Sequence, residues 1–242
     1  DFPNAIIVVM GCYSQKNAEY ILSNCGAHIV LGTSGRNTIM QCLNEYISTK
    51  VKIIKINDDV RHLSYEDFNV VALPKSTRAY VKIQDGCNNF CSYCIIPYAR
   101  GRVRSRKPES IIREITQIAN KGIKEVVITG IHLASYGKDF EENIGLIDLL
   151  EEINKVDGIV RIRLGSLEPK IITEEFMQRL IKLEKICHHF HLSLQSGCDN
   201  TLKRMNRKYT AETFEKEVNL LRKTFPDVAL TTDVIVGFPG ET

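Results

Sequence analysis

In QDGCNNFCSYC, residues 84–94, three cysteines crowd one short loop. Cys87, Cys91 and Cys94 follow the spacing C-x3-C-x2-C, directly after the run AYVKIQ, residues 79–84. That run predicts a β-strand, so the cysteines would begin the loop that follows it. Thiolates are strong ligands for zinc and for iron–sulfur clusters, which makes the loop a candidate metal site.

Three interpretations of these cysteines compete. Inert thiols so close together would be an oxidation hazard, and we rank this interpretation last. A zinc site lacks a fourth ligand at zinc-ribbon spacing, although His132 could supply one. An iron–sulfur site needs only three thiolates to hold three irons of a four-iron cluster, which leaves one iron open to bind a substrate or cofactor.

A strand-then-helix unit recurs through the rest of the chain, which predicts a partial (βα) barrel. Its first helix begins near Pro108 and ends at Gly122. One apolar face of that helix is formed by Ile111, Ile112, Ile115, Ile118 and Ala119. The predicted strands are residues 79–84, 124–129, 159–165, 189–194 and 229–237.

The amino-terminal region has α/β patterning of its own. Short apolar runs at residues 5–11, 27–32 and 51–56 alternate with helical patterns, which predicts parallel strands. We therefore expect an α/β protein in three parts. Residues 1–60 would be the C-terminal part of an α/β parallel-sheet domain, residues 61–77 (with Pro74) a linker, and residues 78–242 a barrel truncated before its end.

The composition of the chain limits the class of protein to which it can belong. The chain has 242 residues, of which 43% are apolar and 25% charged, as is ordinary for a globular protein. No apolar run approaches the length of a membrane span, and the first residues lack the basic start of a signal peptide. Eight cysteines in so well patterned a chain indicate reduced thiols rather than a disulfide framework. We predict a cytoplasmic protein with no membrane partner.

The cysteine loop leads to a family resemblance. With Tyr93 before its last cysteine, C-x3-C-x-aromatic-C resembles the radical S-adenosylmethionine signature, here placed after the first strand of a barrel. The resemblance implies that Cys87, Cys91 and Cys94 are the catalytic ligands of a 4Fe–4S cluster. Its open iron would bind the methionine part of S-adenosylmethionine, which is then split to a 5′-deoxyadenosyl radical.

Longer motifs narrow the resemblance to the methylthiotransferases. They are GCNNFCSYCIIPYARGRVRSR, TGIHLASYG, LQSGCDNTLKRMNRKYT and TTDVIVGFPGET, within residues 86–242. TGIH, where the isopentenyl-adenosine branch tends to have a GQN-type motif, is most similar to the branch that modifies threonylcarbamoyladenosine. The implied reaction adds a methylthio group to carbon 2 of N6-threonylcarbamoyladenosine at position 37 of tRNA. The alternatives are the isopentenyladenosine enzyme, the ribosomal-protein enzyme, and a non-catalytic zinc-binding RNA module.

The same resemblance assigns a second metal site to the amino-terminal region. Methylthiotransferases hold an auxiliary 4Fe–4S cluster with three cysteines, and VVMGCYSQ places the last of these at Cys12. The other two would precede Asp1, so we expect the chain to be a piece of a longer protein that also has an RNA-binding domain. We interpret the remaining cysteines as small buried residues: Cys25, Cys42, Cys187 and Cys198.

Polar residues and glycines follow the predicted barrel strands, where barrels of this kind place their chemistry. Tyr93 would pack on the adenine of the cofactor, and Gly130 would let the backbone approach its methionine amino group. The full set of expected cofactor contacts is Tyr93, Gly130, Ser166, Glu168, Gln195 and Arg204. Ordinary loop structure remains the alternative for each position.

RGRVRSR, residues 100–106, places four arginines at alternate positions: Arg100, Arg102, Arg104 and Arg106. In an extended chain these side chains share one face, which could grip the phosphates of tRNA. A solvated loop, or an arginine packed against the cluster domain, is the alternative. Besides tRNA and S-adenosylmethionine, the resemblance implies an electron donor such as flavodoxin or ferredoxin.

Overall fold

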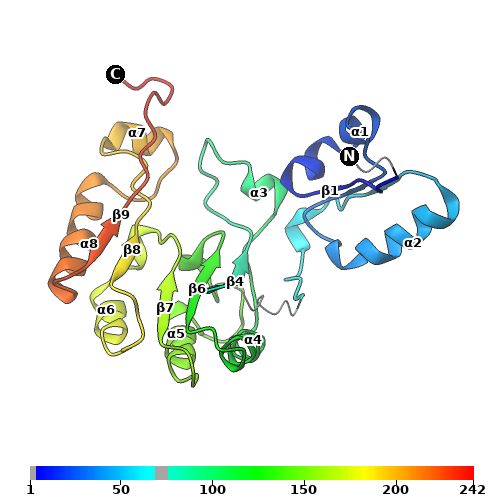
Figure 1. Ribbon diagram of the computed structural model, residues 1–242. Coiled ribbons are helices and arrows are strands. Elements are labelled where there is room, and N and C mark those ends of the chain that lie inside the picture. Colours follow the sequence, from blue (N-terminus) through cyan, green and yellow to red (C-terminus); the bar gives the residue numbers. More distant parts are fainter. Residues whose placement is uncertain (1–3, 69–75) are drawn as a thin grey trace. The chain divides into compact units, whose positions relative to one another are not determined.

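The computed structural model describes residues 4–68 and 76–242 (Figure 1). Pro74 and most of the second half of the predicted linker lie outside these ranges. The chain divides into two compact units, and each is described by itself. The first contains Asp1–Phe68, Gly86–Asn88 and Ile95–Arg102, and the second contains Asn69–Asp85, Asn89–Cys94 and Val103–Thr242.

The first unit is built on a parallel sheet with strands in the order β1 (Val8–Met10), β2 (Ile29–Leu31) and β3 (Ile53–Lys55). Helices α1 (Cys12–Asn24) and α2 (Ile39–Thr49) connect the strands. Because successive side chains of a strand point to opposite faces, Val30 packs with Ile21 of α1, while its neighbours Ile29 and Leu31 pack with Cys42 of α2. The central strand β2 is therefore fully buried, and the parallel-sheet prediction for this region is confirmed.

Three short segments complete the first unit. The 3-10 turns η1 (Arg36–Thr38) and η2 (Val60–His62) flank its sheet, and the short helix α3 (Ile96–Ala99) belongs to this unit although it follows the cysteine loop. The hydroxyl of Thr33 donates to the carbonyl of Ala99 at 2.6 Å. Gly101 has φ +81°, and a Cβ there would lie 1.7 Å from the carbonyl oxygen of Val60, so only glycine fits.

The second unit contains the predicted barrel strands. Its four-stranded sheet has the order β5 (Arg104–Ser105), β4 (Ala79–Asp85), β6 (Glu125–Gly130) and β7 (Arg161–Leu164), and β5 is its antiparallel edge. A parallel pair, β8 (His189–His191) and β9 (Ala229–Thr231), continues beside β7 through a bridge between Leu167 and Leu192. The parallel strands β4, β6, β7, β8 and β9 thus form the wall of a partial barrel (Figure 1).

Helices pack against one face of this wall (Figure 1). They are α4 (Pro108–Asn120), α5 (Leu146–Asn154), α6 (Glu174–Leu180) and α8 (Ala211–Thr224). The short helix α7 (Asp199–Arg204) follows β8. The 3-10 turns η3 (Leu133–Ser135) and η4 (Pro169–Ile171) follow β6 and β7. The apolar face predicted for the first helix enters the core, where Ile111, Ile115 and Ile118 are at most 1% exposed. Ile112 only borders this core.

The last two strands are shorter than the sequence predicts. β8 ends at His191 and β9 at Thr231, instead of residues 194 and 237. The hydroxyl of Thr232 donates to the carbonyl of Leu192 at 2.6 Å, so a side chain takes the place of a backbone donor where the ladder stops. The α/β class and the partial barrel are nevertheless confirmed.

The helices of the described ranges are short, and the cysteines outside the loop differ in burial. The longest helix in the described ranges, α8, has 14 residues, and no helix there is long and apolar enough to cross a membrane. Cys42 is buried as predicted. The prediction is wrong for Cys25 and Cys198, which are exposed because they lie at the end of α1 and at the start of α7.

The core of the second unit should respond strongly to the loss of one side chain. Ile115 is 0% exposed, whereas Ile181 at the end of α6 is 49% exposed. We expect Ile115→Ala to lower the free energy of unfolding by about 2–5 kcal/mol, because it leaves a cavity in the core. Ile181→Ala should cost less than about 1 kcal/mol. Urea denaturation followed by circular dichroism measures both, and equal losses would contradict the core assignment.

Candidate functional site

The candidate site is built where β4, β6 and β7 end. Gln84, at the end of β4, is 0% exposed, and its side-chain oxygen accepts the backbone N–H groups of Ile131 at 3.0 Å and His132 at 2.8 Å. Its amide nitrogen donates to the carbonyl of Asp85 at 2.7 Å. A Cβ on Gly130 would lie 3.1 Å from the Gln84 oxygen, so glycine allows this close approach. One buried amide therefore fixes two neighbouring strand ends.

A hydrogen-bonded group of three side chains lies beside these strand ends. His132 Nε2 is 2.9 Å from Glu168 Oε2, and Asn89 Nδ2 is 3.1 Å from His132 Nε2 and 3.4 Å from Glu168 Oε1. Ser135 holds the other ring nitrogen of His132 at 2.6 Å. Burial acts to raise the pKa of Glu168, but hydrogen bonds and the charges of His132 and Arg207 together hold that pKa below its usual value. Glu168 is therefore an ionised acceptor at the end of β7.

Arg207 brings a buried cation to the cysteine loop. One terminal nitrogen donates to Cys91 Sγ at 3.4 Å, and Nε donates to the Tyr209 hydroxyl at 3.1 Å. The guanidinium carbon also lies 4.8 Å from the centre of the Tyr209 ring, within cation–π range. Tyr209 is fixed in turn, because its hydroxyl donates to the carbonyls of Ser193 and Leu194. Arg207 is thus a rigidly placed charge beside a candidate ligand.

The loop segment from Asn89 to Cys94 is held against residues that follow α7. Ser92 N–H donates to the carbonyl of Met205 at 3.1 Å, and its hydroxyl donates to the carbonyl of Arg204 at 2.9 Å. Asn206 donates from its amide to the carbonyl of Phe90 at 2.8 Å. These bonds connect parts of the chain that are more than a hundred residues apart in sequence.

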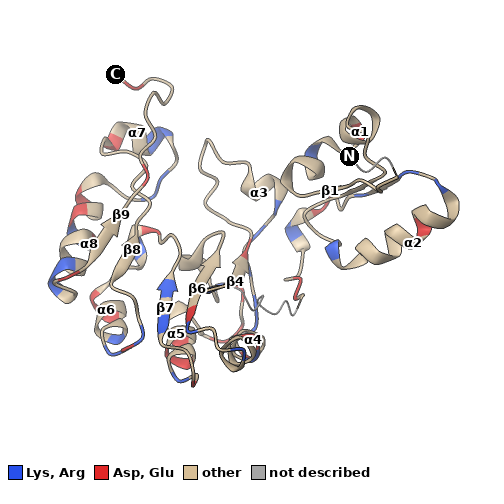
Figure 2. Cartoon of the chain, in the orientation of Figure 1, with Lys and Arg blue, Asp and Glu red and all other residues tan. Residues whose placement is uncertain are grey.

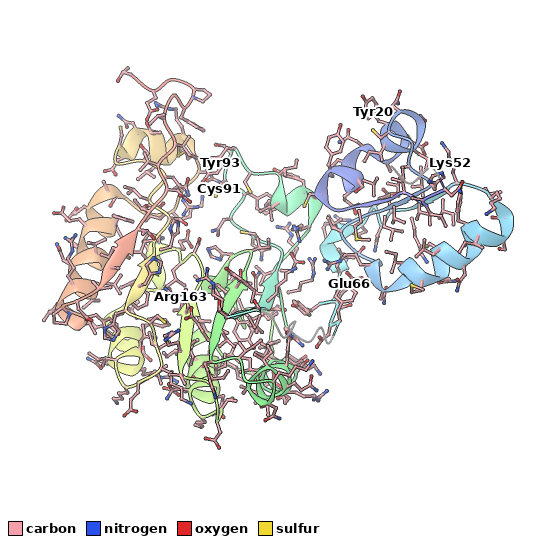
Figure 3. The ribbon with its side chains drawn as sticks, viewed as in Figure 1. Tyr20, Lys52, Glu66, Cys91, Tyr93 and Arg163 are labelled. Atoms are coloured by element: carbon pink, nitrogen blue, oxygen red, sulfur yellow. The ribbon has the colours of Figure 1, made fainter. Side chains whose placement is uncertain are left out.

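Tyr93, on the same segment, is 42% exposed and lies next to Cys91 on the loop (Figure 3). Its ring meets Phe238 edge-on, with 6.4 Å between the ring centres. Partial burial is the main cause that raises the pKa of Tyr93 to about 12, so the hydroxyl stays neutral at ordinary pH. The adenine contact of this ring stays a prediction.

The three cysteines are partly buried and divided between the units. Cys87, whose N–H donates to the carbonyl of Gly101 at 3.1 Å, groups with the first unit, while Cys91 and Cys94 group with the second. Within residues 4–68 and 76–242, no three His, Cys, Asp or Glu side chains are gathered so that they could hold a metal ion. The Cys91 sulfur by itself suits a thiolate ligand of an iron–sulfur cluster, because Arg207 would compensate its negative charge.

The other expected cofactor contacts are only partly brought together. Gly130 and Glu168 lie on the two strand ends described above. Arg204 is exposed at the basic C-terminal end of α7 (Figure 2), and a Cβ on Gly240 would lie 3.5 Å from its guanidinium. Gln195 has φ +67° and its backbone bonds to Asp233 and Ile235, so its own loop is ordered. Ser166 is exposed, and no hydrogen bond described here ties its side chain to this group.

Arg100 and Cys12 meet inside the first unit. Arg100 Nε donates to Cys12 Sγ at 3.2 Å, and Cys12 is the first residue of α1, after Gly11. The sequence assigned Arg100 to RNA and Cys12 to an auxiliary cluster. The contact gives Arg100 a place beside a candidate cluster ligand instead of on an open phosphate-binding face.

The structure corrects the assignment of Arg104 and Arg106 to RNA. Arg104 is 5% exposed and pairs with the buried carboxylate of Asp85 at 3.1 Å, which Lys82 also contacts at 2.5 Å. Arg106 is 4% exposed and pairs with Glu114. β5 joins the edge of the sheet beside β4, and both arginine side chains are buried there instead of facing solvent. Of the four arginines, Arg102 is exposed.

Sequence reasoning missed most of the residues that organise the site. Gln84 precedes the three cysteines and Asn89 lies between them, but neither has a signature of its own, and the sequence indicates His132 only as a possible zinc ligand. In the sequence, Arg207 is one of four basic residues in LKRMNRK, residues 202–208, together with Lys203, Arg204 and Lys208. The available signal was Tyr209, since an aromatic residue two positions from an arginine is compatible with the cation–π contact seen here.

Comparison with known proteins identifies the class. Residues 81–242 match the family described as the Radical SAM superfamily, so the chain belongs to the radical S-adenosylmethionine superfamily. It is 43% identical, over 99% of its length and 53% of the relative, to "Threonylcarbamoyladenosine tRNA methylthiotransferase MtaB" from Bacillus subtilis (strain 168). It is also 43% identical, over 99% of its length and 51% of the relative, to "tRNA-2-methylthio-N(6)-dimethylallyladenosine synthase" from Thermoanaerobacter sp. (strain X514). The chain spans about half the length of these curated relatives.

Solved structures agree with the fold. The radical S-adenosylmethionine methyltransferase TsrM from Kitasatospora setae matches with a TM-score of 0.73 at 18% identity, over 99% of this chain and 52% of that one. The cobalamin-dependent S-adenosylmethionine radical enzyme OxsB matches with a TM-score of 0.58 at 15% identity, over 95% of this chain and 40% of that one. At these identities the similarity shows a shared fold.

The Asp85–Arg104 pair gives a test of the corrected arginine role. Arg104→Gln removes one cation from a carboxylate that is 1% exposed, so we expect a loss of about 3 kcal/mol in the free energy of unfolding. The matched change Arg102→Gln, at an exposed position, should cost less than about 1 kcal/mol. Chemical denaturation at neutral pH distinguishes the two. An Arg104→Gln variant as stable as the wild type would show that this arginine is not a structural charge.

The environment of Glu217 predicts that the stability of the fold depends on pH. It lies on α8 near Lys170 and Glu168, and within the described ranges its buried Oε2 atom has no hydrogen-bond partner. Burial raises its pKa from 4.5 to about 7. The folded-state pKa is above the unfolded one, so the ionised carboxylate destabilises the fold. This cost is absent below about pH 4.5, grows between pH 4.5 and 7, and is complete above pH 7.

We therefore expect Glu217→Gln to stabilise the protein above pH 7 and to have little effect below pH 4.5. The gain should be on the order of 1 kcal/mol, because the side chain is only half buried and solvent screens it. Glu215→Gln, an exposed change on the same helix, is the control and should show no such dependence. The measurement is the free energy of unfolding from pH 4 to 8. A constant difference over that range would contradict the assignment.

Proposed function

We propose that the protein is a radical S-adenosylmethionine methylthiotransferase that acts on carbon 2 of N6-threonylcarbamoyladenosine at position 37 of tRNA. The observation that supports it most is the cysteine loop after β4, where Arg207 contacts Cys91 and an ionised Glu168 lies at the next strand ends. The names of the relatives from Bacillus subtilis and Thermoanaerobacter both describe methylthio chemistry on a modified adenosine of tRNA.

In this proposal Cys87, Cys91 and Cys94 hold a 4Fe–4S cluster that, with bound S-adenosylmethionine, supplies the one-electron chemistry that protein side chains lack. The residues of the chain bind and orient the cofactor. Tyr93 offers its ring to the adenine, and Gly130 leaves the backbone of β6 open to the amino group. Glu168 accepts hydrogen bonds from hydroxyl or amino groups, Arg204 pairs with the carboxylate, and Ser166 and Gln195 bond to the ribose or carboxylate.

The remaining roles follow the same proposal. Cys12, with Arg100 on its sulfur, would be a ligand of an auxiliary cluster. The exposed Arg102 would contact tRNA phosphates. The proposal makes residues 1–60 the C-terminal part of the methylthiotransferase α/β domain, residues 61–77 a linker, and residues 78–242 the partial radical barrel. A low-potential carrier such as flavodoxin or ferredoxin would provide electrons, and the cytoplasm is the expected compartment.

A second candidate is the modification of dimethylallyl (isopentenyl) adenosine in tRNA. The observation that favours it is the relative from Thermoanaerobacter, which is as similar to this chain as the relative from Bacillus subtilis. Mass spectrometry of nucleosides from tRNA treated with the enzyme separates the two, because each product has its own mass.

The radical site is tested by anaerobic reconstitution with iron and sulfide, followed by an assay for 5′-deoxyadenosine with S-adenosylmethionine and dithionite. We expect on the order of four irons per chain at this site, and cofactor cleavage that Cys91→Ala abolishes because the cluster loses a ligand. Cys25→Ala, an exposed cysteine outside the loop, should cleave as the wild type does. Bound zinc with no cleavage would reject the radical assignment in favour of a structural metal site.

A further inference from the structure

Arg207 is buried where the neighbouring basic residues are not. Its side chain is 8% exposed, whereas Lys203, Arg204 and Lys208 are exposed. Removing a guanidinium from water costs free energy, so a chain that buries one needs compensating interactions. The rest of its basic cluster behaves as ordinary surface charge, and Arg207 requires a separate explanation.

The compensation for this charge is incomplete without Cys91. Glu168 is the carboxylate that faces Arg207, but their closest atoms are 3.7 Å apart, whereas Glu168 lies 2.9 Å from His132. Tyr209 supplies a neutral hydroxyl and a ring face. The shortest approach of Arg207 to a group that bears full negative charge as a metal ligand is the 3.4 Å contact with Cys91 Sγ.

Arg207 is not needed merely to hold the loop. Ser92 is tied by its N–H and its hydroxyl to the carbonyls of Met205 and Arg204, and Asn206 bonds to the carbonyl of Phe90. These neutral bonds position the backbone on both sides of Cys91. What Arg207 adds is a fixed positive charge at the sulfur itself, which pH does not remove.

We propose that Arg207 is a positioning residue that raises the reduction potential of the cluster held by Cys87, Cys91 and Cys94. The inference rests on the proposed function. Reduction transfers one electron from a low-potential donor, dithionite in the test below, and adds one negative charge with no bond or proton moved. A cation beside a ligand sulfur favours that extra charge, since net charge and hydrogen bonds to the sulfurs set the potentials of such clusters.

The test is the midpoint potential of the reconstituted protein without S-adenosylmethionine, followed by electron paramagnetic resonance of the reduced cluster. Arg207→Gln keeps a donor but loses the charge, and we expect a more negative potential. Arg207→Lys keeps the charge and should lie closer to the wild type. Lys203→Gln removes one exposed charge from α7 and serves as the matched control, with no shift expected. An intact cluster with unchanged potential in Arg207→Gln would overturn the proposal.

Glu168→Gln provides an independent arm that leaves Arg207 in place. Removing the carboxylate that faces Arg207 leaves the cation less compensated, so the potential should become more positive. If Arg207→Gln takes up no iron, the Glu168→Gln variant becomes the deciding test. An unchanged or more negative potential in Glu168→Gln would then reject the proposal. Failure of the wild type to assemble a cluster would instead reject the proposed function.

Discussion

The buried amide of Gln84 joins the end of β4 to the loop that follows β6, and the candidate site depends on that connection. Parallel strands place their carboxyl ends at one edge of a sheet, but the pairing alone does not fix the loops beyond them. Gln84 does so, because its oxygen accepts the N–H groups of Ile131 and His132. His132 then meets Glu168 at the end of β7, so three strand ends share one hydrogen-bonded network.

Buried charge is used in two different ways in the second unit. Arg104 and Arg106 pair with Asp85 and Glu114, and these ion pairs are structural, because the desolvation of each charge is offset by a partner. The side chain of Arg207 is also buried, at 8% exposed. The carboxylate that faces it, Glu168, is 3.7 Å away and pairs at 2.9 Å with His132. The free-energy cost of burying an arginine is thus offset by different partners at the two places. Carboxylates compensate Arg104 and Arg106, whereas at Arg207 the sulfur of Cys91 also accepts a hydrogen bond.

Burial also separates the basic residues that nucleic acid could reach from those it could not. A run of alternating arginines has the same periodicity whether it faces solvent or a sheet. β5 pairs with β4 at Gln84 and Asp85, and Asp85 draws Arg104 inward. Contact with phosphate requires a guanidinium that water can reach, and the buried side chains of Arg104 and Arg106 do not offer one.

By itself the sequence determined the α/β class, the strand and helix order, the apolar face of α4 and the position of the cysteine loop. These features follow from local rules, namely the periodicity of apolar residues, helix-start and helix-end residues, and ligand spacing. The tertiary structure decided which polar residues meet. Arg207 and Cys91 are 116 residues apart, and Gln84 and His132 are 48 apart. Contacts over such separations depend on how the strands align and what they bury, and no local pattern encodes that.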